Sequence, residues 1–153
     1  MAVKFKADTL HAILREVRSE SSNKRVGELI VTEMRKSMGA GLSPVRGEGR
    51  FVGYKDRKKY PGDLKAARPV NLHLTGDMWN ALTYWSVSGR LVICFQDRDE
   101  AKKAQSHNQG TRHIPRRHFM PTENGEELNV TITRAVRNLY AEILSDIIRK
   151  NRR

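Results

Sequence analysis

The chain contains one cysteine, Cys94, among its 153 residues. A single cysteine cannot form an internal disulfide, and it cannot supply the several thiolates of a structural zinc site. Cys94 lies within the apolar run "LVICF", and a free cysteine in such surroundings usually behaves as a small buried hydrophobic residue. We therefore expect Cys94 to be a packing residue.

Long apolar runs are also missing. No stretch approaches the roughly 20 apolar residues that a helix needs to cross a bilayer, and the first ten residues, "MAVKFKADTL", lack the apolar segment of a secretory signal peptide. Aromatic residues make up only 7% of the chain, which predicts a thin core. We expect a soluble protein that is not secreted and has no membrane partner, folded as one domain over residues 1–153.

Positive charge, by contrast, is in large excess, with a net charge of +12. Such an excess favours binding to polyanions, most simply nucleic acid, or to acidic protein surfaces. Much of it falls in a stretch rich in Gly, Pro, Lys and Arg, residues 43–70, which we call the basic loop. Six of its cations are candidates for contact with nucleic acid or a protein partner: Arg46, Arg50, Lys55, Arg57, Lys58 and Lys59.

Three aromatic residues, Phe51, Tyr54 and Tyr60, alternate with these cations. Mixed cations and aromatics suit contact with phosphates and stacking on bases. A solvated loop without a ligand has the same composition, and so does a loop ordered by neighbouring protein subunits. The sequence contains no base-reading module, so any contact with DNA is expected to be non-specific.

The apolar pattern predicts helices at both ends of the chain. Asp8 is a candidate N-cap for a helical pattern that resumes after "SESSNKR" and ends at Gly39-Ala40-Gly41, as one long helix or two. Thr122 is the candidate cap of the last helix. Its apolar stripe is expected to pack on a sheet, and residues 150–153 form a frayed basic tail. The stripe consists of Leu128, Ile132, Val136, Leu139, Ile143 and Ile147.

Shorter elements are expected between these helices. Thr75 is a candidate N-cap for a short helix, and "TYWSV", "SGR" and "LVICF" predict a β-hairpin. The run "DRDEAKKAQSHN" predicts a helix that ends before Gly110, and "HIPRRHFMPT" an extended segment because of its two prolines. The fold class is therefore α+β, a small antiparallel sheet packed against N-terminal and C-terminal helices, with a long basic loop.

Three of the five histidines, His107, His113 and His118, raise the possibility of a nuclease or metal centre. Their spacings of six and five residues do not match a helical metal pair, and no cluster of carboxylates accompanies them. A Cys94-His107-Asn108 nucleophile set is also formally present, but a cysteine within an apolar strand is poorly activated. Solvated or capping histidines are the better interpretation, and we expect no catalytic residue, metal or cofactor.

The order of features from residue 74 onward resembles the virion-morphogenesis and tail-completion proteins of tailed bacteriophages, a family of minor neck or tail components. In that family a "tG-x-L" segment precedes a strand pair, and a "YA-x-x-H-x-x-G" turn and an "iPaRpFl" segment follow it. The matching residues are Leu74, Thr75 and Gly76; Ala104, His107 and Gly110; and Ile114, Pro115, Arg117 and Phe119. The departures are Gln105-Ser106, Arg116, His118 and the basic loop itself.

This resemblance implies a non-enzymatic structural protein that forms a homo-oligomeric ring at the head-tail junction or the tail end. Its partners would be other neck, connector or tail proteins, and its lumen could contact DNA non-specifically. It would be assembled in the host cytoplasm and retained in the virion. The expected subunit-contact corner, residues 107–119, contains His107, Asn108, Gly110, Pro115, Arg117 and Phe119. Two alternatives are a stand-alone nucleic-acid-binding protein and a small His-dependent nuclease.

Overall fold

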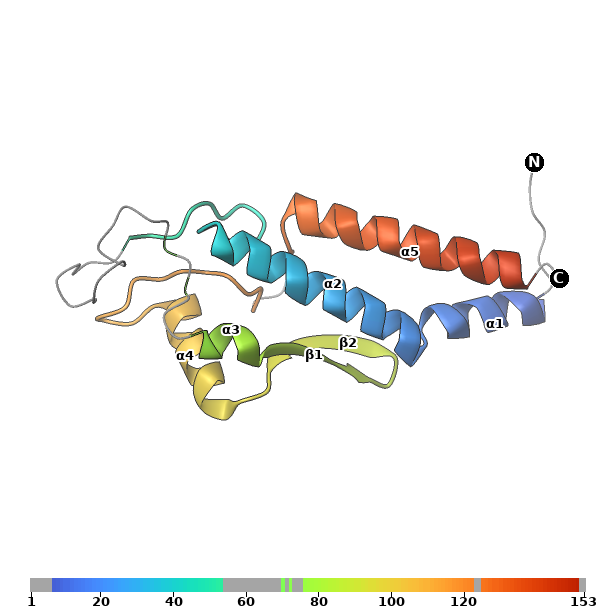
Figure 1. The fold of residues 1–153 in the computed structure, drawn as a ribbon, viewed down its shortest axis with the longest axis horizontal. Helices are drawn as coiled ribbons and strands as arrows, with labels where there is room; N and C mark the ends of the chain where they lie inside the picture. The colour runs from blue at the N-terminus through green and yellow to red at the C-terminus, as the bar shows by residue number, and fades with distance from the viewer. Residues whose placement is uncertain (1–6, 54–69, 71, 73–75, 123–124, 152–153) are drawn as a thin grey trace.

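The computed structural model describes residues 7–53, 70, 72, 76–122 and 125–151. The fold is α+β, as predicted. Within these residues, five helices and two strands follow one another in the order α1 (Ala7–Val17), α2 (Glu20–Gly39), α3 (Asp77–Ala81), β1 (Leu82–Val87), β2 (Arg90–Phe95), α4 (Arg98–Gln109) and α5 (Val130–Lys150). Helix α2 lies between α5 on one side and the β1–β2 hairpin on the other, and α2 and α5 run in opposite directions (Figure 1).

The N-terminal helical pattern, which the sequence left open as one long helix or two, forms two separate helices, α1 and α2. The break falls at Arg18-Ser19, where the Ser19 hydroxyl accepts a hydrogen bond from the backbone N–H of Ser22 at 3.2 Å and caps α2. Helix α1 already begins at Ala7, so Asp8 lies within the helix and does not cap it. Helix α2 ends where predicted, with Ala40 as C-cap and Gly41 in the left-handed region at φ 72°.

The hairpin forms as predicted, with Tyr84 opposite Ile93 and Trp85 opposite Val92. Ser88 and Gly89 both have positive φ (51° and 74°), as a tight two-residue turn requires. One face of the hairpin packs on α2. A Cβ added to Gly27 of α2 would come within 2.4 Å of the Tyr84 ring, so that only glycine permits this close approach.

The opposite face of the hairpin is open to solvent. Trp85, Val87 and Val92 alternate with the residues that contact α2, and they are 57%, 54% and 46% exposed. Cys94 lies on this same face and is only half-buried, so the expectation of a buried cysteine is wrong. Its partial desolvation still raises the pKa of the thiol, which keeps it protonated and unreactive.

Helix α5 starts later in the chain than predicted, and it packs on other elements than predicted. Asn129, not Thr122, is the N-cap, and its side-chain oxygen accepts from the N–H of Ile132 at 3.0 Å. Gly125 has a φ of +88°, a left-handed conformation that no α-helix accommodates, so a helix cannot run from Thr122 through it. Helix α5 packs on α2 and α1 rather than on the sheet, and Leu128 precedes the helix.

The remaining predicted elements fit with small changes. Helix α4 ends at Gln109, directly before Gly110, and residues 113–122 are irregular as expected. Thr75 lies outside the described residues, and Gly76, at φ 90°, occupies the position before α3. The core is formed largely between α2, the hairpin and α5, with Met34, Met38 and Ile132 almost fully buried. None of the helices in the described ranges has the length and apolar character of a membrane span.

Candidate functional site

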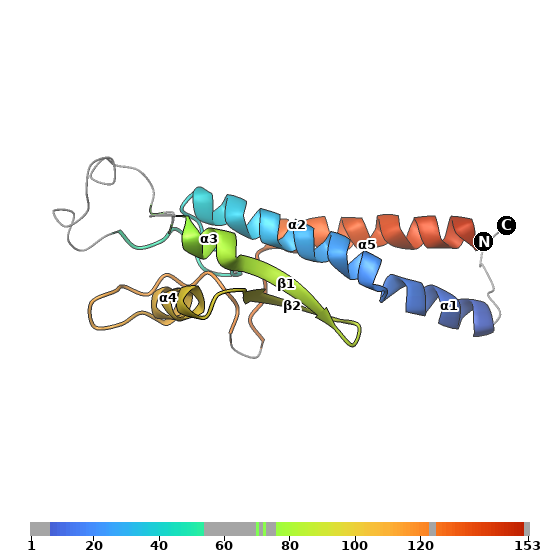
Figure 2. The same ribbon diagram turned by 60° about the horizontal axis from the view of Figure 1, so that its bottom comes forward.

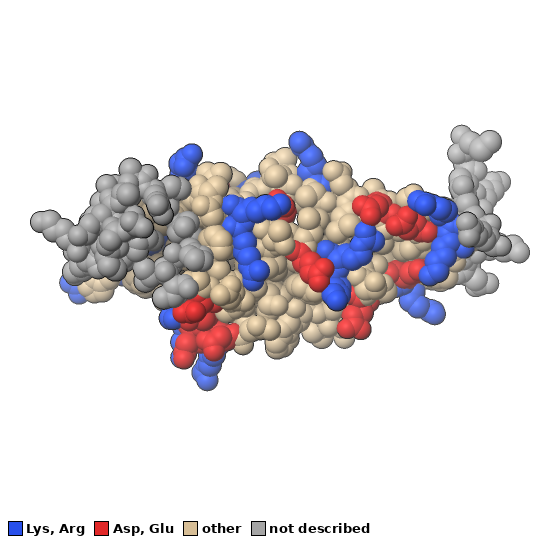
Figure 3. All heavy atoms as spheres, in the orientation of Figure 1, with Lys and Arg blue, Asp and Glu red and all other residues tan. Residues whose placement is uncertain are grey.

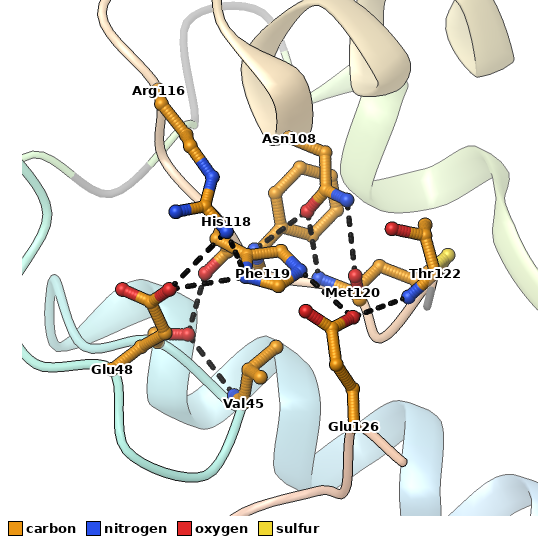
Figure 4. Close-up of polar contacts among 10 residues, drawn as sticks. Val45, Glu48, Asn108, Arg116, His118, Phe119, Met120, Thr122 and Glu126 are labelled. Atoms are coloured by element: carbon orange, nitrogen blue, oxygen red, sulfur yellow. Dashed lines mark hydrogen bonds and ion pairs between the residues drawn. The ribbon is translucent and has the colours of Figure 1, made fainter. Parts of the chain in front are cut away.

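The candidate corner lies at the C-terminal end of α4, where the chain reverses in a loop and runs back past the helix (Figure 2). Asn108 holds the two segments together. Its side-chain oxygen accepts from the backbone N–H groups of Phe119 and Met120 at 2.8 and 2.9 Å, and its amide nitrogen donates to the Met120 carbonyl at 3.0 Å (Figure 4). Asn108 is only 4% exposed, and its described bonds are all internal to the fold.

Arg117 ties the corner to the first part of the basic loop. The guanidinium is 2% exposed and donates through Nε to the carbonyl of Val52 at 3.0 Å. A second contact of 3.5 Å reaches the carbonyl of Gly53, and the Arg117 backbone N–H donates to the carbonyl of His107 at 2.7 Å. These bonds from a buried guanidinium to carbonyl oxygens fix Val52 and Gly53 against the corner.

The His107 ring lies beside this guanidinium, with Nδ1 3.3 Å from Arg117 Nη1. Because a guanidinium has only donors, Nδ1 acts as the acceptor and the ring is neutral in this arrangement. Burial, and secondly the positive charge of Arg117, lower the pKa of His107 below its ordinary value. His107 is therefore a partly buried structural residue next to a helix end.

His118 is buried between two carboxylates. Its Nδ1 lies 3.1 Å from Oε1 of Glu48 and its Nε2 3.3 Å from Oε2 of Glu126, while Arg116 approaches Nδ1 at 2.8 Å (Figure 4). The Ser43 hydroxyl donates to the His118 carbonyl at 2.5 Å. This ring thus joins the corner to the basic loop and to the segment that leads into α5, and the expectation of a solvated or capping histidine is wrong for it.

Phe119 and Gly110 give the corner its shape. Phe119 is 1% exposed and packs edge-on against Phe95 of β2, with ring centroids 6.4 Å apart. Gly110 combines a φ of 78° with a ψ of 161°, a backbone conformation that is essentially restricted to glycine. Pro115 follows a turn in which the Thr111 N–H donates to the Ile114 carbonyl at 2.8 Å, and it is half-buried.

The three histidines do not form a common centre in the part of the chain that the structure describes. His107 faces Arg117, His113 is exposed on the turn, and His118 is enclosed by carboxylates on opposite ring nitrogens. Because those two carboxylates lie on opposite sides of the ring, they cannot converge with it on one ion. No group of three or more His, Cys, Asp or Glu among the described residues could hold a metal.

The structure describes only two of the six candidate cations of the basic loop. Arg46 and Arg50 are described and exposed, and Arg46 forms an ion pair with Glu127 at 2.6 Å. Lys55, Arg57, Lys58 and Lys59 lie outside the described residues. The described part of the loop is anchored to the rest of the fold, because Val45 bridges to Leu128 and the N–H of Asn129 donates to the Pro44 carbonyl at 2.7 Å.

Sequence reasoning missed Ser43, Glu48 and Glu126, the partners that enclose His118. Glu48 lies 70 positions from His118, and no local pattern connects them. Asn129 was also missed, although an Asn directly before an apolar helical run is a common capping signal.

Comparison with known proteins adds no relative. No protein-family model matches the chain, and no curated protein or solved structure matches it. The family resemblance therefore depends on the motif residues in the sequence alone.

The lowered pKa of His107 predicts an acid-sensitive corner. The unfolded chain takes up this proton near the ordinary His pKa of 6.5, before the folded chain does. The contribution of His107 to stability is thus constant above that pH. It is lost as the pH decreases from 6.5 through the lower pKa of the folded state. We expect His107→Asn, which keeps an acceptor near Nδ1, to lose less stability than the parent between about pH 7.5 and about pH 5 in urea unfolding.

The matched control for this prediction is His113→Asn, because His113 is exposed. It should lose as much stability as the parent over the same pH interval. Equal losses for the His107 variant and the parent would show that other groups cause the acid sensitivity.

Proposed function

We propose that the chain is a structural subunit of a tailed-phage virion, a neck or tail-completion protein that assembles as a homo-oligomeric ring. The observation that carries this proposal is the behaviour of the residues that match the family motifs. Ala104 and Phe119 are buried at the corner, Gly110 turns the chain there, and Arg117, which contacts His107, connects the corner to the basic loop. Such residues fix the shape of the corner, which suits an architectural role.

The open face of the hairpin supports subunit association. Trp85, Val87 and Val92 expose apolar groups side by side on one face, and exposed apolar patches are common at protein–protein contact sites. The hairpin is also a two-stranded sheet, so each strand has one edge that no described strand pairs with. A second copy of the chain, placed against this face, would bury the aromatic and aliphatic groups in the manner of interface anchors.

The same proposal includes the partners and the location. Neighbouring neck, connector or tail proteins would contact the ring, which would be assembled in the host cytoplasm and retained in the virion. The buried residues Asn108, Arg117 and Phe119 would act in subunit contact only indirectly, by fixing the exposed residues around them, because each is at most 4% exposed.

Lysine substitution on the hairpin tests the association. We expect Trp85→Lys with Val92→Lys to convert an oligomer into a single chain in size-exclusion chromatography with light scattering, because buried unpaired ammonium groups oppose the interface. The control is Leu144→Lys, a 40% exposed apolar residue on α5, which should leave the oligomer intact. A parent chain that stays monomeric, alone and with virion connector proteins, and is absent from particles by electron microscopy would refute the proposal.

A further inference from the structure

A basic hollow of about 310 Å³ lies beside the first half of α5. Arg134 and Arg137 of the helix line it together with Arg46 of the basic loop and Asn138. Residues three apart on a helix lie on the same side, so both α5 guanidiniums are directed to one region of the surface. Three guanidiniums and one side-chain amide thus surround a space large enough for a small anionic group.

Charge within this hollow is not balanced. Glu127 is the one acidic residue in its lining and is already paired with Arg46 at 2.6 Å. Within the described ranges, neither Arg134 nor Arg137 has a carboxylate within ion-pair distance. The first turn of α5 contains no acidic residue either, so the positive end of the helix dipole adds to the excess.

The other half of α5 is different. Arg149 pairs with Asp146 at 3.0 Å, Lys150 pairs with Glu16 of α1 at 3.0 Å, and Glu142 pairs with Arg25 of α2 at 2.7 Å. Along much of the molecular face in Figure 3, basic and acidic side chains likewise lie close together. The hollow therefore differs from the C-terminal half of the same helix, where Arg149 and Lys150 are paired with carboxylates.

The anionic groups that a binding partner could place in the hollow indicate which class of molecule binds there. Among the described carboxylate side chains, only those of Glu20 and Glu28 on α2 have no hydrogen bond, ion pair or capping role within the chain. The described part of a second copy therefore offers few unpaired carboxylates to two arginines. A nucleic acid offers a continuous row of phosphates, and guanidinium groups bind phosphate oxygens in bidentate geometry.

We propose that this hollow, formed by Arg46, Arg134 and Arg137, binds the phosphodiester backbone of nucleic acid. No aromatic residue lines it, so binding takes place through phosphates and not through stacked bases, and it is independent of sequence. Asn138 supplies a neutral donor. The Thr133 hydroxyl already donates a hydrogen bond to the Leu128 carbonyl at 3.0 Å. The site lies between the first half of α5 and Arg46 of the basic loop, and it does not depend on the proposed ring.

Salt-dependent binding of a fluorescent duplex of about 20 base pairs tests the site by anisotropy. We expect Arg134→Gln with Arg137→Gln to reduce the slope of log K against log salt by about 2, and the affinity near 0.1 M salt by tens of fold. The control, Arg149→Gln with Lys150→Gln, removes the same charge from the same helix where both groups are paired. It should change the slope by less than about 1.

Two outcomes would overturn the site. Equal losses in the two double variants would show that only net charge matters. Binding of fluorescent polyglutamate as tight as that of the duplex, with the same loss in the Arg134/Arg137 variant, would assign the hollow to an acidic protein segment. Light scattering on the same samples separates this test from that of the ring, because the Arg134/Arg137 variant should keep the parent's mass.

Discussion

Replacing Asn108 with alanine is expected to lower the free energy of unfolding by about 3 kcal/mol. The side chain is 4% exposed and makes three hydrogen bonds to the backbone of Phe119 and Met120. Alanine would leave two N–H groups and one carbonyl without partners next to the core, and each such group costs about 1–3 kcal/mol unless water reaches it. Chemical denaturation followed by circular dichroism measures the difference.

Two further variants make this prediction specific to the amide. Gln109→Ala removes an exposed amide from the next position of α4 and should change stability by less than about 0.5 kcal/mol. Asn108→Asp keeps an acceptor for the two N–H groups but places an oxygen against the Met120 carbonyl, so it should be strongly destabilising as well. A loss below about 1 kcal/mol for Asn108→Ala would mean that the corner is held mainly by Phe119 and the His118 contacts.

The elements that the sequence predicted correctly depend on local signals. The Ser88-Gly89 turn, the apolar residues on either side of it and the stop at Gly110 all act over a few residues. The start of α5 was missed because Thr122 has the residue type and the acidic neighbours of a helix cap. In the structure, Glu126 instead accepts from the Thr122 N–H at 2.7 Å and contacts His118, and the left-handed Gly125 rules out a helix there.

The candidate site was predictable in its residues but not in its contacts. Polar and glycine residues close together at 107–119 indicate a structured turn, and Asn108, Gly110 and Phe119 do build one. Their partners, however, come from segments distant in sequence: Arg117 donates to Val52, 65 positions away, and His118 meets Glu48. Such pairings depend on how α2 and α5 bring the loop and the corner together, and no local pattern encodes them.

The two proposed contact surfaces lie on different sides of the molecule. The hairpin and α5 are separated by α2 (Figure 1), and the open face of the hairpin is directed away from α2. A neighbouring copy on Trp85 and Val92 would therefore leave the hollow beside Arg134 and Arg137 accessible. In a ring, this arrangement permits subunit association through one surface and contact with a nucleic-acid backbone through another, so each can be disabled separately by mutation.

Gly110→Ala is expected to destabilise the fold by about 3 kcal/mol, and here the cause is backbone geometry rather than lost hydrogen bonds. At φ 78° and ψ 161° an L-residue is strained by about 1–3 kcal/mol. The added Cβ would also lie 2.9 Å from the backbone nitrogen and 3.0 Å from the Cα of Arg116. Backbone atoms cannot rotate away as a side chain can, so residues 111–117 would have to shift and the Arg117 contacts would weaken.

Gly47→Ala is the matched control, because Gly47 also has a positive φ, 84°, but a Cβ added there would meet no atom within 4 Å. It isolates the conformational cost of a left-handed residue, about 1 kcal/mol. Denaturation of both variants under the same conditions should therefore give a difference of about 2 kcal/mol between them. Equal losses would show that the segment after Gly110 yields easily, and the corner would then be too soft to fix the position of a neighbouring subunit.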